Sequence, residues 1–507
     1  MMEEMQTVSI LDYLERSESL YKYRPAVTDG KQELTWHELA VMARKIGSGI
    51  SKRTEPGSPV PVLLEKSPTA LAAMLGIAYA GCFYVPVNPV NPPERLKKIL
   101  EKLEPKVIVT DERGKDQLAE IQESELAVSA QTLLQEEVDV WKLEEIRKER
   151  KETDILYGIF TSGSTGTPKA IAVSHGAVIR FIRHFTEIFG ITEEDRIGNQ
   201  APFDFDVSVK DIYSSVMTGA KLVLIPKEYF STPPRLLDYL CDQEVTNLTW
   251  AVSALTLVSA LKGLNYKVPE SVKRIMFSGE AMPPKQLRIW QKKLPQTRFV
   301  NLYGPTEITC NCTYFEVGRP YEDNEKIPAG KAFPGRRVFL MDDEGHQIDQ
   351  PEVQGEICVA GESLANGYYR DPEQTAEKFV FYPVDQGEEQ RIYKTGDLGY
   401  LDQDGNLIFA GRKDFQIKHM GHRIELEEIE SALTALDGVE KSCCIFDTKR
   451  NKIVGFYMGE ADSSTVRKQM KEKLPAYMIP SKLTQVDEMP LNKNGKTDRN
   501  YFKQQIL

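Results

Sequence analysis

The chain has 507 residues, of which 41% are hydrophobic and 27% are charged, and it carries a formal net charge of −11 at pH 7. This composition is typical of a globular protein and excludes a disordered or fibrous one. Because a single hydrophobic core stops growing at about 250 to 300 residues, the length predicts two or three domains. The acidic balance argues against a nucleic-acid partner, which requires a basic surface.

The first residues, MMEEMQTVSI, are acidic where a targeting peptide would be basic. No apolar run in the sequence approaches the roughly 18 residues that a membrane span needs. We therefore expect a cytoplasmic protein without membrane insertion. The seven cysteines are an odd number scattered along the chain, which favours reduced thiols over a disulfide framework.

Short β-branched runs alternate with helical stretches through the first part of the chain, and this alternation predicts βαβ units with mostly parallel sheets. The runs cover residues 59–64, 106–110, 155–160, 221–225, 246–250, 272–277 and 297–302. From about residue 336 to 410, shorter intervals with turn residues separate the strands, which predicts a small antiparallel β-barrel.

The last part of the chain has a different pattern. Residues 424–435 repeat apolar side chains at helical spacing, strand-like runs follow at 442–446 and 453–458, and a second helix ends before Leu474-Pro475. We predict an α/β protein with a large N-terminal domain over residues 1–412, which includes the barrel, and a small, mobile α+β C-terminal domain over residues 413–507.

Residues 155–169, ILYGIFTSGSTGTPK, are an apolar strand that leads into a loop of glycines and hydroxyl side chains closed by Lys169. Glycine lets backbone N–H groups converge on an anion, the hydroxyl groups add donors, and Lys169 adds a positive charge. The spacing differs from that of P-loop NTPases. The loop alone predicts a phosphate site of another class, with a flexible Ser/Gly turn as the alternative.

This loop resembles the signature phosphate loop of the adenylate-forming superfamily. Six further segments match motifs of that superfamily in the same order: LTWHEL at 34–39, YVPVNP at 84–89, NLYGPTE at 301–307, YKTGD at 393–397, GRKD at 411–414 and NGK at 494–496. The resemblance covers essentially the whole chain. It implies an enzyme that uses ATP and Mg²⁺ to convert a carboxylate into an acyl-AMP and then transfers the acyl group to a thiol.

The resemblance also implies roles for individual residues. Lys496 would bridge the substrate carboxylate and the phosphate as the first catalytic residue, with Arg412 and Lys169 as further catalytic cations. Glu307 would be the Mg²⁺ ligand. The expected ATP-binding residues are Thr161, Ser162, Gly163, Ser164, Thr165, Gly166, Asn301, Leu302, Tyr303, Gly304, Pro305, Thr306, Asp397, Arg412 and Lys496.

Two half-reactions would be served by one movement of the small domain about a hinge at Asp414, as the resemblance implies. In the second arrangement, the stretch around Gly421 and His422 would line the thiol tunnel. For His422 a simple surface position is the alternative.

The segment PFDFDVSV at 202–209 bears on the substrate. In amino-acid-activating members of the superfamily an aspartate at the position of Asp206 pairs with the substrate ammonium group, whereas Asp204 and Asp211 are interpreted as structural or solvated. Lys210 replaces an apolar residue of the D-alanine ligases. If Lys210 points into the pocket, it would suit a substrate with a polar or acidic side chain. If Lys210 points outward, it would indicate nothing about the substrate. The expected substrate-binding residues are Asp206, Val207, Lys210, Thr249, Met276, Ser278, Leu302, Cys310 and Asn311.

The chain is most similar to D-alanine to carrier-protein ligases and to adenylation domains of nonribosomal peptide synthetases. We therefore expect an amino-acid substrate, D-alanine or another small or polar one, and a separate carrier protein with a phosphopantetheine thiol as acceptor. Two alternatives are an acyl- or aryl-CoA ligase of the same superfamily, which would not need Asp206, and a non-enzymatic binding protein. The second would not need Lys169, Glu307, Asp397, Arg412 and Lys496 together.

Overall fold

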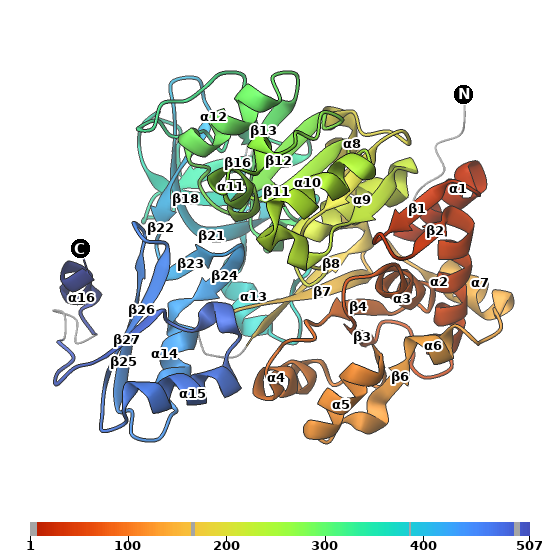
Figure 1. The fold of residues 1–507 in the computed structure, drawn as a ribbon, viewed down its shortest axis with the longest axis horizontal. Helices are drawn as coiled ribbons and strands as arrows, with labels where there is room; N and C mark the ends of the chain where they lie inside the picture. The colour runs from red at the N-terminus through yellow and green to blue at the C-terminus, as the bar shows by residue number, and fades with distance from the viewer. Residues whose placement is uncertain (1–7, 164–167, 385–386, 491–496, 507) are drawn as a thin grey trace.

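The computed structural model describes residues 8–163, 168–384, 387–490 and 497–506. Within these residues the chain forms two large sheets with helices on their faces, a third antiparallel sheet and a C-terminal region that lies beside them (Figure 1). The predicted α/β fold class is confirmed. All seven cysteines, which lie in the described part, are free thiols, as predicted.

The first large sheet has nine strands in the order β15-β14-β13-β12-β11-β9-β10-β1-β2 within the described chain. The strands from β13 to β1 run parallel, whereas β2, β14 and β15 are antiparallel to their neighbours. Their bounds are β1 Pro25–Thr28, β2 Glu33–Thr35, β9 Arg196–Asn199, β10 Lys221–Leu224, β11 Asn247–Ala251, β12 Arg274–Ser278, β13 Arg298–Tyr303, β14 Thr313–Glu316 and β15 Lys331–Ala332.

The second large sheet has the order β19-β8-β7-β4-β3-β5-β6 in the described residues. It is parallel from β7 to β6, and β8 and β19 are added antiparallel. The bounds are β3 Pro59–Leu63, β4 Phe83–Pro86, β5 Ile108–Thr110, β6 Ala127–Ser129, β7 Ile155–Thr161, β8 Lys169–Ser174 and β19 Gly367–Tyr368. Every run predicted as a strand in this part of the chain overlaps an observed one.

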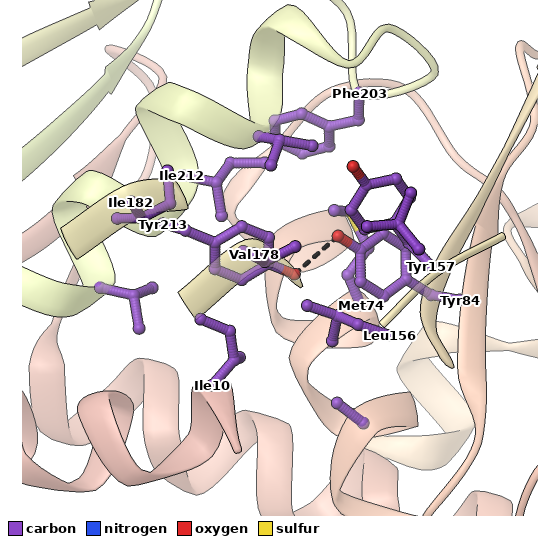
Figure 2. Close-up of a cluster of buried hydrophobic side chains, with 14 of the residues drawn as sticks. Ile10, Met74, Tyr84, Leu156, Tyr157, Val178, Ile182, Phe203, Ile212 and Tyr213 are labelled. Atoms are coloured by element: carbon purple, nitrogen blue, oxygen red, sulfur yellow. Dashed lines mark hydrogen bonds between the residues drawn. The ribbon is translucent and has the colours of Figure 1, made fainter. Parts of the chain in front are cut away.

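One hydrophobic core joins buried residues between Ile10 and Leu407, which come from both large sheets and their helices and from the third sheet. In Figure 2, Tyr84 of β4 and Tyr213 of α9 meet at their hydroxyl groups, 2.6 Å apart, among aliphatic side chains of α1, α3 and α8. The hydrogen bond satisfies two polar atoms that would otherwise be costly to bury. The helices are α1 Ile10–Tyr21, α2 Trp36–Ser51, α3 Pro68–Tyr79, α4 Pro93–Leu103, α5 Glu112–Glu120, α6 Ala130–Leu133, α7 Val140–Glu149, α8 His175–Phe189, α9 Val207–Thr218, α10 Pro233–Asp242, α11 Val252–Ala260 and α12 Pro284–Lys293.

The motif LTWHEL at 34–39 has a local structural role. Thr35 caps the N-terminus of α2 by accepting from the backbone N–H of Glu38, and the Glu38 carboxylate accepts from the backbone N–H of Thr35. This reciprocal capping box satisfies two donors that the helix end leaves unpaired. The motif therefore sets where β2 ends and α2 begins.

The third sheet is antiparallel and curled, as the predicted barrel subdomain requires, with the order β17-β16-β18-β21-β20 and with β22 paired to β21. Its strands are β16 Arg336–Met341, β17 Gln347–Ile348, β18 Gly355–Gly361, β20 Phe379–Pro383, β21 Glu389–Leu401 and β22 Leu407–Arg412, and α13 spans Pro372–Lys378. Asp397 of β21 lies opposite Arg412 of β22 in the register.

The C-terminal region has its own small core. A hairpin of β23 (Gln416–His419) and β24 (His422–Glu425), here called the C-terminal hairpin, leads into α14 (Leu426–Thr434). A three-stranded sheet of β25 (Lys441–Asp447), β26 (Lys452–Met458) and β27 (Lys482–Gln485) packs against α14, α15 (Ser463–Lys473) and α16 (Arg499–Ile506). Helix α15 contacts α4 of the N-terminal part (Figure 1). The predicted boundary at 412/413 stays a prediction.

Candidate functional site

A cavity lies where strands β7, β12 and β13 end, and the C-terminal hairpin covers it. Thr161, Ser278 and Gly304 line it at or just after these strand ends, and Lys418 and His422 line it from the hairpin. The carboxyl ends of neighbouring parallel strands form a common binding edge in α/β sheets. Strands β12 and β13 are neighbours in the first large sheet, β7 belongs to the second, and the hairpin comes from the C-terminal region. The cavity therefore combines residues from widely separated parts of the chain.

Among the residues predicted to bind the nucleotide, Asp397 and Arg412 line the cavity, and we call this group the nucleotide end. Arg412 contacts Asp397 through Nη1 and also donates from Nε and Nη2 to the two carboxylate oxygens of Asp414, both at 2.6 Å. The hydroxyl of Tyr303 donates to Asp397 at 2.6 Å. Burial, with the negative charge of Asp397, raises the pKa of Tyr303. The predicted hinge residue Asp414 is thus bound directly to the predicted nucleotide contact Arg412.

The phosphate loop, residues 161–169, is held at its base by the antiparallel pair β7–β8, which places Thr161 opposite Lys169. Residues Ser164, Thr165 and Gly166 lie outside the described residues. Ser162 and Gly163 at the start of the loop both contact the C-terminal region. The Ser162 hydroxyl donates to the backbone oxygen of Arg423 at 2.6 Å, and the N–H of Gly163 donates to the Glu428 carboxylate at 3.3 Å.

Glu307 lies in a short 3₁₀ turn, Thr306–Ile308, directly after β13, and its carboxylate is 1% exposed. Arg423 donates from Nη1 to both of its oxygens, at 2.9 and 2.7 Å, and Tyr368 donates to one at 2.9 Å. Burial alone would raise the pKa of Glu307, but Arg423 holds it below its ordinary value. Lys169 lies nearby, with its ammonium 5.8 Å from the Tyr368 ring centroid.

An ionised carboxylate at this position fits a magnesium ion, because Mg²⁺ is commonly held by one or two carboxylates together with substrate phosphates. The described residues contain no group of three or more His, Cys, Asp or Glu side chains that could hold a metal by themselves. An ion at Glu307 would therefore depend on phosphate oxygens for most of its ligands.

Among the residues predicted to bind the amino acid, Asp206 and Lys210 line the same cavity, and we call this group the amino-acid end. Asp206 precedes the first residue of α9, and its side chain makes no capping hydrogen bond to the helix. The carboxylate of an N-cap aspartate usually accepts from the helix backbone, so Asp206 stays available to the cavity that it lines. Burial raises the pKa of Asp206, although the positive charge of Lys210 opposes this.

Lys210 points into this cavity, which answers the question that the sequence left open. It lies one helical turn after Asp206, its side chain is 1% exposed, and its ammonium donates to the Asn311 side-chain oxygen at 2.7 Å. Burial lowers the pKa of Lys210, against the attraction of Cys310, Asp206 and Asp211. Across the described residues, no carboxylate lies within salt-bridge distance of its ammonium.

The neighbouring aspartates differ from each other. Asp204 also lines the cavity, where burial raises its pKa to about 6, and it accepts from Asn88 at 3.3 Å. Asp211 is buried behind the cavity wall and accepts from Asn199 at 2.9 Å, and burial raises its pKa to about 7. The interpretation of Asp211 as structural is consistent with these contacts.

His422 lines the cavity and is not a surface histidine. Its ring stacks on Tyr477, with ring centroids 3.4 Å apart, and meets the edge of Phe205 at 4.6 Å. Burial, together with nearby positive charges, lowers the pKa of His422 to about 3, so the ring is neutral. The next residue back, Gly421, donates its N–H to Glu280 at 3.1 Å, which fixes the tip of the C-terminal hairpin.

The predicted site residues divide into three groups: those that line the cavity, those that support it without lining it, and those outside the described residues. Those that line the cavity are Thr161, Ser162, Asp206, Val207, Lys210, Ser278, Gly304, Pro305, Thr306, Cys310, Asn311, Asp397 and Arg412. Those that support it without lining it are Gly163, Lys169, Thr249, Met276, Asn301, Leu302, Tyr303 and Glu307. Lys496 lies outside the described residues, and its described neighbours Pro490 and Asp498 are joined by a backbone hydrogen bond of 2.7 Å.

Sequence reasoning missed Arg423, Glu428 and Arg95. Arg423 and Glu428 come from the C-terminal hairpin and α14, and Arg95 of α4 donates to Glu428 at 2.5 Å in an ion pair whose side chains are 8% and 3% exposed. A charged residue at the start of an amphipathic helix is normally solvated. Only the packing of the C-terminal region on the phosphate loop shows that these charges are buried.

Comparison with known proteins assigns the family. The family model described as "AMP-binding enzyme" matches residues 14–369, and the model described as "AMP-binding enzyme C-terminal domain" matches residues 428–496. The chain belongs to the AMP-binding enzyme family. The resemblance to the adenylate-forming superfamily is thereby confirmed, and the second match begins within α14.

Curated members of this AMP-binding family include both stand-alone proteins and parts of very long chains. The chain is 33% identical to the D-alanine–D-alanyl carrier protein ligase of Bacillus velezensis over 94% of its own length and 95% of that protein. It is 34% identical to surfactin synthase subunit 1 of Bacillus subtilis over 92% of its length, but it spans only 13% of that subunit. It spans 44% of tyrocidine synthase 1 of Brevibacillus parabrevis, at 32% identity.

A solved structure shows the same fold. The Vibrio cholerae adenylation domain AlmE, in complex with glycyl-adenosine-5′-phosphate, superposes with a TM-score of 0.85 at 22% sequence identity, over 100% of this chain and 99% of that one. No described helix of this AMP-binding enzyme is long and apolar enough to cross a membrane.

Proposed function

We propose that this AMP-binding enzyme activates an amino acid with ATP and passes it to the phosphopantetheine thiol of a separate carrier protein. The amino-acid carboxylate attacks the α-phosphorus, and the bond from that phosphorus to the oxygen bridging to the β-phosphate breaks, so that pyrophosphate leaves. In the second step the thiolate attacks the acyl carbon, a C–S bond forms, and AMP leaves with the electrons of the broken C–O bond.

The observation that carries this proposal is the position of Asp206 in the same cavity as Asp397 and Arg412. An ammonium group bound at Asp206 is neutralised in a site where an unmatched charge is costly. The nucleotide end supplies an acceptor for ribose hydroxyls in Asp397 and a cation in Arg412. One cavity thus has separate sites for an amino acid and a nucleotide.

Lys210 supports a polar or acidic substrate side chain. Its ammonium has three N–H donors, and the described chain provides one acceptor for them, Asn311. A side chain with a carboxylate, carbonyl or hydroxyl would pair the remaining donors, whereas a methyl group would leave them unpaired. D-alanine, named in the 33% identical relative from Bacillus velezensis, is the second candidate substrate.

We assign the other roles from the family resemblance. Lys496, Arg412 and Lys169 stabilise the charge of the pentacoordinate phosphorus, and Asp414 is the hinge between residues 1–412 and 413–507. Glu307 would hold Mg²⁺, which would neutralise charge on the phosphates. Positioning and charge neutralisation are the main protein contributions to phosphoryl transfer chemistry. The localisation that we propose is cytoplasmic.

The test is amino-acid-dependent exchange of radiolabelled pyrophosphate into ATP, run across the proteinogenic amino acids and D-alanine. We expect exchange with one or a few amino acids that is abolished in Lys496→Ala. Exchange with aryl or fatty acids and with no amino acid would overturn the proposal and favour an acyl- or aryl-CoA ligase. No exchange with any acid would favour a non-enzymatic binding protein.

A further inference from the structure

Residues 309–311, here called the pocket turn, begin with two strained residues in succession. Thr309 and Cys310 have φ angles of 56° and 72°, in the left-handed region that non-glycine residues rarely adopt. Within the described residues they are the one pair of consecutive non-glycine residues in that region, and Thr309 is the one β-branched residue there. A β-branched side chain makes this conformation still less favourable. The contacts around the pocket turn must therefore hold it in place.

The pocket turn brings two side chains to the amino-acid end of the cavity. The thiol of Cys310 donates to the backbone oxygen of Asp206 at 3.2 Å, and the Asn311 side-chain oxygen accepts from Lys210 at 2.7 Å. Both Cys310 and Asn311 line the cavity. The conformation of the pocket turn therefore decides how this wall of the cavity meets the start of α9.

The third sheet fastens the pocket turn from behind. The Thr309 hydroxyl donates to the backbone oxygen of Ser363 at 2.7 Å, and the backbone N–H of Ala365 donates to the backbone oxygen of Glu307 at 2.8 Å. Ser363 and Ala365 directly follow strand β18 of that sheet. Thr309 and Ser363 are 0% and 3% exposed, so loss of the hydroxyl would leave a buried carbonyl oxygen without this donor, which is costly.

We propose that Thr309 is a positioning residue for the amino-acid end, where its hydroxyl fastens the strained pocket turn to the third sheet and so holds Cys310 and Asn311 against the start of α9. Thr309 does not itself line the cavity, so its effect on the substrate passes through these two residues. The inference rests on the proposed function and adds to it. The third sheet, which carries the predicted nucleotide contact Asp397, also shapes the amino-acid site.

The experiment uses the full chain and the variant Thr309→Val, which keeps the shape of the side chain and removes the hydroxyl. The KM for the amino acid in the exchange assay should rise about fivefold, because loss of the hydrogen bond lets the pocket turn relax. The KM for ATP should stay at the wild-type value. Thr309→Ser keeps the hydroxyl and should restore the KM for the amino acid.

Thr313→Val is the matched control. Thr313 is 1% exposed, its hydroxyl donates to the backbone oxygen of Ala329 at 2.7 Å, and it does not line the cavity. Both valine variants lose one buried hydrogen bond of the same length, so they should lower the urea midpoint of unfolding by similar amounts. Only Thr309→Val should raise the KM for the amino acid. If Thr309→Val does not fold, Thr309→Gly, which removes the hydroxyl together with the backbone strain, should show the same selective rise.

A chemical measurement reports on the pocket turn without any substrate. Cys310 is 2% exposed, and its alkylation by iodoacetamide can be followed by mass spectrometry. The rate should be about fivefold higher in Thr309→Val than in the wild type or in Thr313→Val, because the relaxed turn exposes the thiol. Cys241 of α10 provides the internal reference, and its rate should be the same in all three proteins.

Equal changes of the two KM values in Thr309→Val, an equal rise in Thr313→Val, or failure of Thr309→Ser to restore the KM would overturn the inference. An unchanged alkylation rate of Cys310 would overturn it as well. If the wild-type protein shows no amino-acid-dependent exchange, the proposed function fails, and the alkylation rates still decide whether the Thr309 hydroxyl holds the pocket turn.

Discussion

The two ends of the cavity are built differently. At the amino-acid end, Lys210 lies on helix α9 and Asp206 immediately precedes the first residue of that helix, and their neighbours Asn311 and Ser278 belong to the nine-stranded sheet and its loops. At the nucleotide end the contacts come from both parts of the chain. Arg412, for example, joins Asp397 of β21 to Asp414, which follows the last strand of the third sheet.

This difference separates recognition of the amino acid from the proposed movement of the C-terminal region. Residues at and just before the start of one helix keep their geometry when another domain moves, and under the proposed function the amino-acid end would retain the acyl group through both half-reactions. At the nucleotide end Arg412 contacts Asp414, the proposed hinge residue, so under the proposed function this end would change when the C-terminal region moves. Variants at the amino-acid end should therefore alter which acid is used, and variants at the nucleotide end should alter how ATP is used.

The largest effect should come from Asp206→Asn, which removes the partner of the substrate ammonium in a site of low polarity. An unpaired buried charge costs about 3 kcal/mol or more, which is a factor of roughly a hundred or more in the KM for the amino acid. The KM for ATP should change little. Steady-state exchange kinetics with each substrate varied in turn measure both constants, and parallel changes would refute the separation of the two ends.

A smaller effect is expected for Asp397→Asn at the other end. Hydrogen bonds to a charged group contribute about 1.5 to 3 kcal/mol, so the KM for ATP should rise roughly tenfold to a hundredfold. Tyr303→Phe, which removes one donor to the same carboxylate, is the matched control and should cost about tenfold or less. If Asp397→Asn raised the KM for the amino acid and left the KM for ATP unchanged, Asp397 would not belong to the nucleotide end.

The sequence was sufficient to predict much of the fold. Strong periodicity predicted the parallel strands and the helices α14 and α15, and the structure confirms them. Periodicity predicts such segments well because burial of one face decides their structure. The motif Asn301 to Glu307 lies at the end of β13, and its residues after that strand, Gly304 to Thr306, line the cavity, while their role in nucleotide binding stays a prediction. The ionised state of Glu307 could not be predicted, because it depends on Arg423, which is 116 residues away in the sequence.

The orientation of Lys210 shows a second limit. On α9 a lysine four residues after an aspartate usually forms a solvated pair, and nothing in the sequence indicates which face of the helix is covered. The nine-stranded sheet and the segment with Cys310 and Asn311 cover that face. Long-range packing therefore decides whether this charge bears on specificity.

Lys210→Met tests specificity with a still smaller expected effect. If the substrate side chain accepts a hydrogen bond from the ammonium, the preference for that amino acid over one with an apolar side chain should fall about tenfold. Competition between the two amino acids in the exchange assay gives the ratio directly. Asn311→Leu is the matched variant, because it removes the side-chain oxygen that accepts from Lys210 and keeps the lysine. It should alter the preference between the two amino acids less than Lys210→Met does. An unchanged ratio in Lys210→Met would show that this lysine does not contact the substrate.

The pH dependence of amino-acid binding should show the smallest effect and should link the two residues. The ammonium needs an ionised Asp206, and burial raises the pKa of that carboxyl. The KM for the amino acid should therefore increase as the pH falls, beginning at a higher pH than an exposed aspartate would require. Lys210 lowers the pKa of Asp206, so Lys210→Met should move the inflection to still higher pH.

Asp204 also lines the cavity, with a pKa of about 6, and Asp204→Asn shows whether it contributes to the same profile. His422, with a pKa lowered to about 3, stays neutral across the accessible range. A profile that moves in Asp204→Asn and not in Lys210→Met would assign the titration to Asp204. Such a result would place the charge that binds the ammonium two residues before Asp206, and the amino-acid end would then no longer depend on the residues at the start of α9.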